Sequence, residues 1–487
     1  MNKPVRIVVA VAALCLALPA SSWVFGKQIE TALDAHYGKL GELPHFRIVA
    51  REFDRGWFRS TETVTFELNG ELLRDAAGAP GDEELSLSAE QGASAEPVRF
   101  TLRSEIVHGP FPGMTTIAAA VSDTELVLDD SARAVVARLF GDRKPFELNT
   151  VHGFTGAGTA TLKIPEFVAE QTDENGAAMR LTWQGLTATV DFGRDLRDYR
   201  LRGEVPGVQI EDGSSRLTAT GLRVEADQRH IFDDEPFLFA GTQKFALAEL
   251  KLVPQGVSGE QGGAVTPMQL KRLTYDVNVP VKGEFVDINA KMAAEVVQVG
   301  NRNFGPAHYD LSFNHMHARS LADLSRAVMG VYRGGVAASS PRAQGEAMLA
   351  AMERPAKALL AQGPEFSLDR VSFSSPYGEA EVAARLRGND LQPEDLGNPL
   401  ALMAKLELSG RMSFPERLLT DLQGLGAASS QDRQVDAQSM EKLLSGYAAQ
   451  GLLQRDAGIV KSSLEYKGGQ LKVNGTLVDP FSMMAQR

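Results

Sequence analysis

The chain has 487 residues, a length that at roughly 150 residues per domain predicts two to four domains or one long repetitive domain. Its 62 Asp and Glu residues outnumber its 50 Lys and Arg residues, and the net charge of -12 argues against nucleic acid as a partner. Cys15 is the single cysteine, so an intramolecular disulfide bond and a zinc site built from cysteines are both excluded.

The N-terminal segment predicts a membrane anchor. Lys3 and Arg6 precede an uncharged run from Ile7 to Phe25, which as a helix would be about 28 Å long, close to the thickness of a bilayer core. Positive charge before this run places the N-terminus in the cytoplasm and the body, from Lys27 onward, in a bacterial periplasm. We therefore predict a single-pass inner-membrane protein with a periplasmic body.

A cleaved signal peptide is the alternative interpretation of the same segment. The apolar stretch would then end at Leu18, and residues 20–22 would supply the small side chains of a cleavage site. We favour an anchor because Trp23 and Phe25 continue the apolar run, and Trp23 is an aromatic residue suited to the membrane interface. The residues alone leave both interpretations open.

Segments in which apolar and polar residues alternate, the pattern of β-strands, dominate the chain after residue 26. Val64, Phe66 and Leu68 lie on one face of a predicted strand, and Thr and Glu residues occupy the other face. Similar runs, bounded by turn residues, predict strands at 100–107, 116–128, 146–151, 178–192, 216–226, 245–253, 273–279 and 285–299. We predict a mainly β protein of the α+β class, in which region 27–319 is a long antiparallel meander forming an extended curved sheet.

Two internal echoes indicate a repetitive build. The pattern Arg-Leu-Thr-x-x-Gly-Leu occurs at residues 180–186 and again at 216–222. A second pattern, Phe-x-Leu followed by Val-His-Gly, leads to His108 and returns before His152. Similar composition among strands separated by glycine turns is the alternative explanation.

Region 320–487 is predicted to mix helices with strands. Helical spacing of apolar residues predicts helices at 320–331, with Ser320 as N-cap, at 343–361, with a kink at Pro355, and at 415–425 and 435–453. The runs 459–466 and 471–477 flank Gly468 and Gly469, so a closing β-hairpin is expected. The helices thus gather in the C-terminal third.

Sequence signatures of catalysis are absent. The chain has no Gly-x-Ser-x-Gly elbow, no His-Glu-x-x-His helix and no phosphate-binding loop. His315-x-His317, with His308 nearby, would place two imidazoles on one strand face as in a metal site, but no third ligand completes it. We predict no catalytic residue, cofactor or metal, and interpret these histidines as structural.

Four segments resemble a known family. They are residues 26–30 after the anchor, the Arg55-Gly56-Trp57-Phe58-Arg59-Ser60 segment, the His108-Gly109-Pro110-Phe111-Pro112 motif and the closing hairpin. Together they resemble the YdgA-like family of bacterial envelope proteins, whose function is uncharacterised. The resemblance implies an inner-membrane anchor and a large periplasmic body, and it implies no catalytic residue.

The two aromatic motifs also have physical interpretations. Gly56 permits a tight turn beside Trp57, which we expect to pack in the core or at its rim; the alternative is that Trp57 faces a ligand or a membrane surface. Pro110 and Pro112 remove two backbone donors, so the strand must end there. We expect a structural corner in which His108 bonds to the backbone and Phe111 fills the core; the alternative is a rigid recognition loop.

Two functions of different classes remain, and a hydrolytic enzyme is a third candidate that no motif supports. In the first, the curved sheet offers an apolar groove that binds a lipid or other apolar envelope ligand beside the membrane. In the second, the body is a scaffold or assembly factor that binds envelope proteins, or another copy of itself, through sheet edges and C-terminal helices. A groove that the helices leave uncovered would favour ligand binding. A filled groove with unpaired sheet edges would favour the scaffold.

Overall fold

The computed structural model describes most of the predicted body. It covers residues 46–68, 98–128, 130–172, 178–235, 238–255, 266–333, 341–392, 394–395, 398–418 and 430–478, together with Lys27, Glu30, Leu33 and Asp34. The predicted anchor from Ile7 to Phe25, and residues 419–425 of a predicted helix, lie outside this part. Within the described residues, no helix combines the length and the apolar character needed to cross a membrane.

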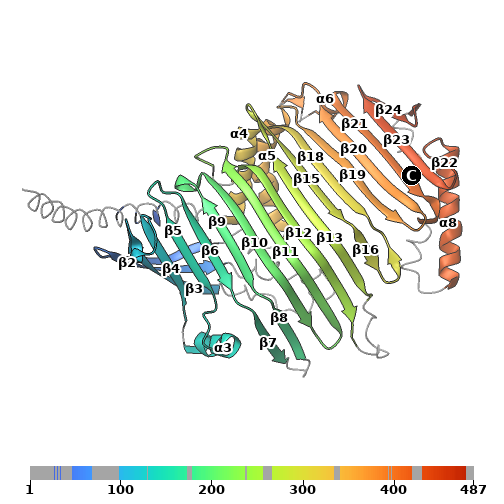
Figure 1. Ribbon diagram of the computed structural model, residues 1–487. Coiled ribbons are helices and arrows are strands. Elements are labelled where there is room, and N and C mark those ends of the chain that lie inside the picture. Colours follow the sequence, from blue (N-terminus) through green and yellow to red (C-terminus); the bar gives the residue numbers. More distant parts are fainter. Residues whose placement is uncertain are drawn as a thin grey trace, which may run out of the picture.

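The strands form one antiparallel sheet (Figure 1). In the first half these are β1 (Phe46–Arg55), β2 (Arg59–Leu68), β3 (Val98–His108), β4 (Ala120–Val127), β5 (Glu147–His152), β6 (Gly158–Ile164), β7 (Phe167–Thr172), β8 (Ala178–Trp183), β9 (Leu186–Phe192), β10 (Asp198–Glu211), β11 (Ser215–His230) and β12 (Phe239–Pro254). The second half contains β13 (Met268–Val279), β14 (Val281–Lys282), β15 (Phe285–Ala294), β16 (Val296–Val299), β17 (Arg302–Asn303), β18 (Ala307–His317), β19 (Glu365–Ser375), β20 (Gly378–Gly388), β21 (Leu406–Pro415), β22 (Gln454–Asp456), β23 (Ile459–Lys467), β24 (Gln470–Val473) and β25 (Thr476–Val478). The predicted mainly β class and the long antiparallel meander are confirmed.

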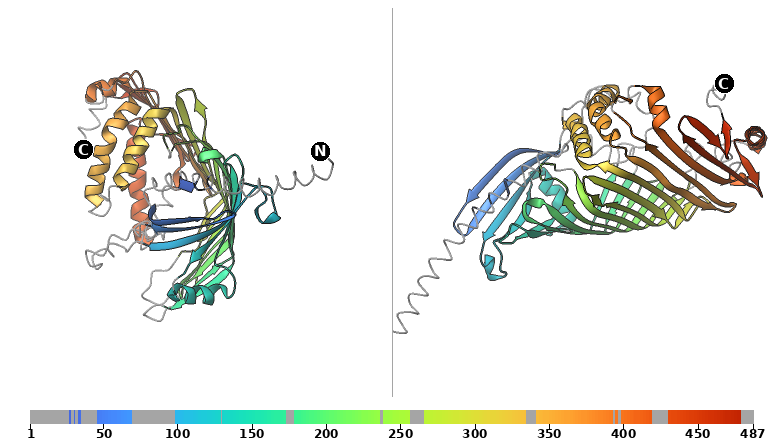
Figure 2. Two further views of the ribbon diagram at one scale, coloured as in Figure 1. Left: turned by 90° about the vertical axis from the view of Figure 1, so that its left-hand side faces the viewer. Right: turned by 90° about the horizontal axis from the view of Figure 1, so that it is seen from above.

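The described helices are few. They are the short turns η2 (Pro112–Met114) and η3 (Arg194–Leu196), and the helices α3 (Asp130–Phe140), α4 (Ala318–Arg333), α5 (Pro341–Leu360), α6 (Pro399–Lys405) and α8 (Ser430–Ala449). Figure 2 shows the sheet bending into a trough, with α4 and α5 on its concave side. Because β18 pairs with β19 across the predicted boundary at residue 320, one sheet runs through both predicted regions of the body.

A line of irregular residues, here called the crease, crosses the middle of the sheet. It runs through residues 165–166, 184–185, Pro206, Gly221, Ala248, Arg272 and Glu295, where regular pairing is interrupted. Gly185 and Gly221 have positive φ, which glycine adopts without steric cost. These are the glycines of the first sequence echo, so that echo marks strands bent at one level. The predicted single strand 178–192 is divided at this point into β8 and β9.

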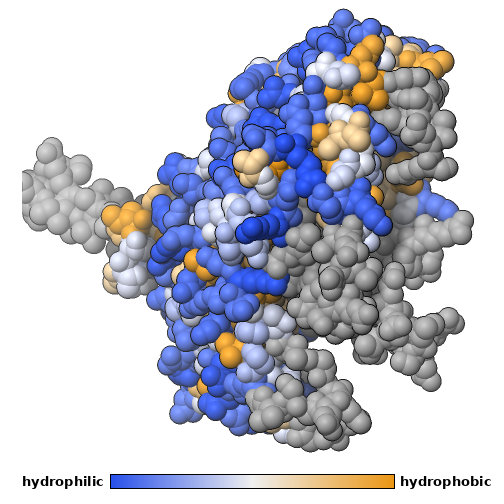
Figure 3. Space-filling model, turned by 90° about the vertical axis from the view of Figure 1, so that its right-hand side faces the viewer, coloured by the Kyte–Doolittle hydropathy of each residue, from blue (hydrophilic) through white to orange (hydrophobic). Residues whose placement is uncertain are grey.

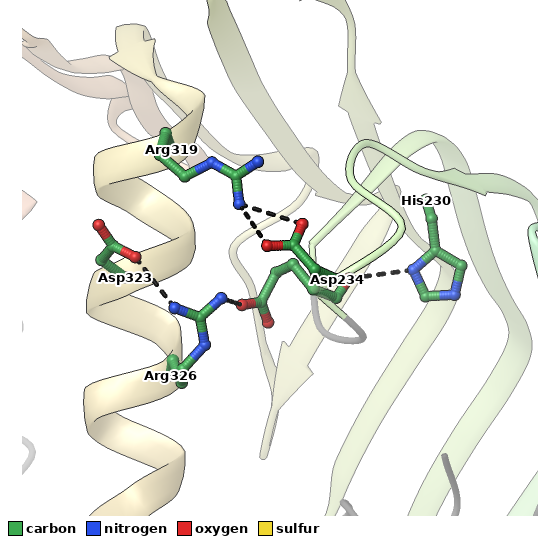
Figure 4. Close-up of polar contacts among 6 residues, drawn as sticks. His230, Asp234, Arg319, Asp323 and Arg326 are labelled. Carbon is green, nitrogen blue, oxygen red and sulfur yellow. Dashed lines mark hydrogen bonds and ion pairs between the residues drawn. The ribbon is translucent and has the colours of Figure 1, made fainter. Parts of the chain in front are cut away.

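Helix α4 is fixed to the sheet by apolar packing and by ion pairs. Ala318 and Ala322 pack with Val286 and Met316 of the sheet in one buried cluster. Arg319 of α4 pairs with Asp234 in the connection between β11 and β12, where Arg319 Nη1 lies 2.9 Å from Asp234 Oδ2 (Figure 4).

A second ion pair lies deeper, where Arg326 Nη2 is 2.6 Å from Oε2 of the buried Glu235. Removing the partner of the buried Glu235 carboxylate would leave its charge uncompensated, so the contact with Arg326 helps to hold α4 over this end of the sheet.

The start of α4 differs from the sequence prediction. The helix begins at Ala318, and the backbone N–H of Ser320 donates to Nδ1 of His317 at 3.3 Å. His317 therefore occupies the N-cap position that we had assigned to Ser320. The imidazole satisfies a backbone donor in the first turn, which gives His317 a structural role.

Candidate functional site

One face of the central sheet carries apolar side chains across many strands. Cross-strand partners lie on the same face, and every second residue returns to it. The rows running away from α4 are Val279, Ile288, Phe313 and Phe366; then Val277, Ala290, Leu311 and Leu368; then Phe245, Tyr275, Met292, Tyr309 and Val371. This surface, here called the apolar face, is the side on which α4 and α5 pack.

The described helices cover one end of the apolar face and leave part of the rest accessible. Val286, near the helices, is fully buried. Farther along the same strands, 42% of Tyr275, 39% of Met292 and 42% of Tyr309 remain exposed. These three residues are cross-strand neighbours on β13, β15 and β18, and we call them the exposed row. Described helices therefore leave an apolar row accessible.

The opposite face is charged. One row of direct cross-strand partners alternates in sign over neighbouring strands: Arg202, Glu225, Lys244, Asp276, Lys291, Asp310 and Arg370. Opposite charges facing one another across strands stabilise the pairing, and such a row is well solvated. This charge ladder assigns the polar side of the sheet to water. The apolar face is therefore not a consequence of uniformly apolar strands.

A cleft at the turn ends of β10 to β13 combines charged and apolar residues. It has a volume of about 730 Å³, and its lining includes Arg200, Asp227 and Arg229 together with Phe192 and Val279. Opposite charges are paired there, with Arg200 Nε 3.0 Å from Asp227 Oδ2. Neutralised side chains of this kind fit a solvated surface better than a site for an apolar ligand.

The two aromatic motifs, far apart in the sequence, meet at one end of the sheet. Arg55 ends β1, and Gly56, Trp57 and Phe58 form the turn to β2. His108 ends β3, and its backbone N–H donates to the carbonyl oxygen of Phe58 at 2.8 Å. The resemblance to a family was carried by these residues, and the structure joins them into one site.

His108 is the buried centre of this site. Its Nδ1 lies 3.4 Å from the carbonyl oxygen of Trp57, and its Nε2 lies 2.9 Å from Oγ of Ser60. Because a carbonyl oxygen only accepts, Nδ1 carries the hydrogen and Nε2 accepts from the Ser60 hydroxyl. Burial lowers the pKa of His108 below its ordinary value, so the imidazole is neutral at pH 7. The predicted bond from His108 to the backbone is confirmed.

The second sequence echo has a structural counterpart. His108 and His152 lie on either side of β4, where each is the partner of Ala120. Nε2 of His152 lies 3.4 Å from Oγ of Ser122, as Nε2 of His108 lies near Ser60. The repeated Val-His-Gly thus places equivalent buried His–Ser contacts at the ends of two strands.

Gly109 and the prolines lead the chain away from the sheet. The N–H of Gly109 donates to the carbonyl oxygen of Ala119 at 2.6 Å, and a Cβ at residue 109 would lie 1.9 Å from the carbonyl oxygen of Ala118. Only glycine fits this close approach. Residues 116–119, predicted as part of a strand, belong to the connection, because β4 begins at Ala120.

The aromatic residues of both motifs face outward. Phe111, predicted to fill the core, is 54% exposed, so that prediction is wrong. Pro110 and Pro112 restrict the backbone beside Phe111, but they do not determine which way its ring points. Trp57 is 63% exposed on its turn, which excludes packing in the core.

The histidines of the candidate metal motif are separated in their roles. His315 has positive φ in a bulge of β18, and its ring stacks on Phe285 with centroids 3.8 Å apart. His317 caps α4, and His308 lies opposite Ala293 on β15. Among the described residues, no cluster of three or more His, Cys, Asp or Glu side chains could hold a metal ion.

The fold and these surfaces define a class of protein built on one long antiparallel sheet that has an apolar face and a charged face. The chain belongs to a family described as bacterial proteins of unknown function, DUF945, whose model matches residues 1–480. This agrees with the resemblance inferred from the motifs.

Two relatives match the chain at low sequence identity. The chain is 20% identical over 520 residues to Protein YdgA of Escherichia coli, an alignment that covers 98% of this chain and 94% of the relative. An uncharacterized protein of Haemophilus influenzae is 19% identical over 247 residues, which cover 48% of this chain and 65% of that protein. No solved structure matches the chain.

Proposed function

We propose that this chain is a membrane-anchored periplasmic envelope protein that performs no catalysis and binds a lipid or other apolar envelope ligand on its apolar face. The observation that carries the proposal is the exposed row on a sheet whose other face bears a charge ladder. Apolar ligands bind where adjacent apolar side chains are accessible within a concave surface.

The membrane location supplies the ligand in this proposal. The N-terminal anchor, residues 7–25, would hold the periplasmic body next to the inner membrane, where lipids are abundant. The trough would then shield part of an acyl chain from water, while the charge ladder faces the periplasm. No cofactor and no nucleic acid enters this function.

Native mass spectrometry of the full chain tests the proposal. The protein is extracted from its membrane in mild detergent and examined for a stoichiometrically bound lipid. In the test variant the exposed row becomes polar: Tyr275→Thr, Met292→Thr and Tyr309→Thr. The matched control changes the adjacent residues of the charge ladder: Asp276→Thr, Lys291→Thr and Asp310→Thr.

The proposal predicts a lipid on the wild-type protein and on the control, and its loss from the row variant at an unchanged melting temperature. Threonine suits strands at all six positions, so the sheet is expected to persist in both variants. Equal lipid binding by the two variants, or no lipid on any form, would contradict the proposal.

The alternative is a scaffold or assembly factor, and exposed apolar residues on the helices support it. Leu349 on α5, Leu400 on α6, and Leu443 and Tyr447 on α8 are all exposed. A complex with another envelope protein or with a second copy would cover these residues. Size-exclusion chromatography with light scattering, before and after Leu443→Ser with Tyr447→Ser, would detect self-association through α8.

A further inference from the structure

Three successive turns, which lie at the same end of neighbouring strands, expose large apolar side chains. They connect β1 to β2, β3 to β4 and β5 to β6, and the strands that they join lie side by side. Met114 is 94% exposed, Ile117 72% and Trp57 63%. We call the whole set the apolar tip: Trp57, Phe58, Phe111, Met114, Ile117 and Phe154.

The turn segments of the tip also lack charge. Residues 56–58, 109–122 and 153–162 contain no Asp, Glu, Lys or Arg, and the first of these segments lies between Arg55 and Arg59. Figure 2 (left) shows the connection between β3 and β4, in cyan, projecting from the body, and Figure 3 shows an apolar patch at one margin of a mostly hydrophilic view. A projecting, uncharged and apolar surface can enter a lipid interface without desolvating an ion.

Later turns at the same end of the strands show whether the absence of charge is general. The turn from β9 to β10 contains Arg194, Asp195 and Arg197, and the connection from β11 to β12 contains Asp233 and Asp234. All of these turns join strands of the same meander, yet only the first three are free of charge. The apolar composition is therefore a property of this end of the molecule and not of its turns in general.

The N-terminal chain runs toward the tip. Asp34 forms an ion pair with Arg51, and Oε2 of Glu30 lies 2.8 Å from Nη1 of Arg55, the last residue of β1 before the tip. The step from Asp34 back to Glu30 thus follows β1 toward its turn. Phe25, the end of the predicted anchor, is five residues earlier, within at most about 17 Å of Glu30.

We propose that the apolar tip inserts into the interface of the bilayer that holds the anchor, which gives the body a second membrane contact and a fixed orientation. Trp57 and the phenylalanines suit this depth, because aromatic side chains favour the boundary between headgroups and acyl chains. The inference rests on the proposed membrane location for its geometry, but not on ligand binding by the apolar face.

Fluorescence quenching by brominated lipid tests the inference in the full chain. The chain has three tryptophans, Trp23, Trp57 and Trp183. Trp23→Phe with Trp183→Phe leaves Trp57 as the reporter, and the protein is reconstituted into phosphatidylcholine vesicles with or without brominated acyl chains. A second protein, with Trp57→Phe and Trp183→Phe, reports on Trp23 in the anchor. A control without native tryptophans carries Leu196→Trp on the charged turn between β9 and β10.

The inference predicts that Trp57 in vesicles emits at a shorter wavelength than the tryptophan of the Leu196→Trp control, and that brominated lipid removes most of its emission. The Leu196→Trp control keeps its intensity. An unquenched Trp57 contradicts the inference, whether water or a protein partner covers the tip. If Trp23 is quenched and Trp57 is not, the anchor is supported and insertion of the tip is contradicted. If Trp23 is not quenched, the proposed membrane anchor is contradicted.

Discussion

The molecule has two accessible apolar surfaces, and they are built in different ways. The exposed row lies on regular strands, where residues one step along the chain belong to the charge ladder. The apolar tip lies on turns, where long uncharged segments leave the sheet. Strand residues serve folding and binding together, because their alternation also defines the core face. Turn residues at the tip contribute little to the core, so their apolar character points more directly to a partner.

The first way to sharpen this comparison is the same substitution at two isoleucines. Ile106 is 1% exposed on β3, and Ile106→Ala should lower the free energy of unfolding by about 2–5 kcal/mol, because it leaves a cavity. Ile117 lies on the tip and is 72% exposed, so Ile117→Ala should change it by less than about 0.5 kcal/mol. Urea denaturation measures both. Equal effects would mean that the tip is part of the core.

A second substitution tests whether the shape of the tip is imposed by the sheet. A Cβ at Gly109 would overlap the carbonyl oxygen of Ala118, so Gly109→Ala should destabilise the protein by roughly 1–3 kcal/mol. The control Gly213→Ala has no atom within 4 Å of the new Cβ and should leave the melting temperature unchanged or slightly higher. A neutral Gly109→Ala would show that the connection is not held against β4.

The buried imidazole beneath the tip predicts a pH dependence. Because the folded pKa of His108 lies below its ordinary 6.5, the unfolded chain binds a proton more readily than the folded chain. The stability from this group is complete above about pH 6.5 and is lost as the pH falls through the folded pKa. His108→Gln should flatten the curve of unfolding free energy between pH 5 and pH 7, as estimated from the ordinary histidine range. Parallel curves for the two proteins would contradict a neutral buried His108.

The smallest expected effect concerns Phe111. Its position in the sequence predicts a core residue and a loss of several kcal/mol on truncation, but its exposure predicts a change within about 0.5 kcal/mol for Phe111→Ala. Thermal unfolding of the detergent-solubilised protein provides the measurement. A large loss of stability would return Phe111 to the core and remove it from the apolar tip.

Strand alternation made much of this fold predictable, and the failures have physical causes. The alternation that includes Val64 and Phe66 predicts β2. The sequence does not predict β10, because Pro206 and Gly207 interrupt an otherwise regular alternation. The crease has a visible signal: apolar residues change parity between Trp183 and Leu186, as expected where an extra residue interrupts the pleat. Strand β20 is rich in alanine, which is a stronger signal for helices than for strands.

The candidate site was predictable in its residues but not in its arrangement. The Arg55 to Phe58 and His108 to Phe111 motifs stood out as separate turns, and only the pairing of β2 with β3 brings them together. The direction of Phe111 depends on where the chain leaves β3, a tertiary property that the prolines do not encode. The exposed row was equally hidden, because strand alternation identifies an apolar face but not how much of it helices cover.

Photocrosslinking with lipid in the native membrane tests the central claim most directly. Cells are supplied with a fatty acid whose acyl chain contains a photoreactive group, and they are then illuminated. The crosslinked peptides of the full chain are mapped by mass spectrometry. The account predicts lipid adducts at both apolar surfaces in the membrane, and adducts only around Tyr275, Met292 and Tyr309 when illumination follows purification in detergent. Adducts on the charge ladder, or none on the exposed row in either condition, would contradict it.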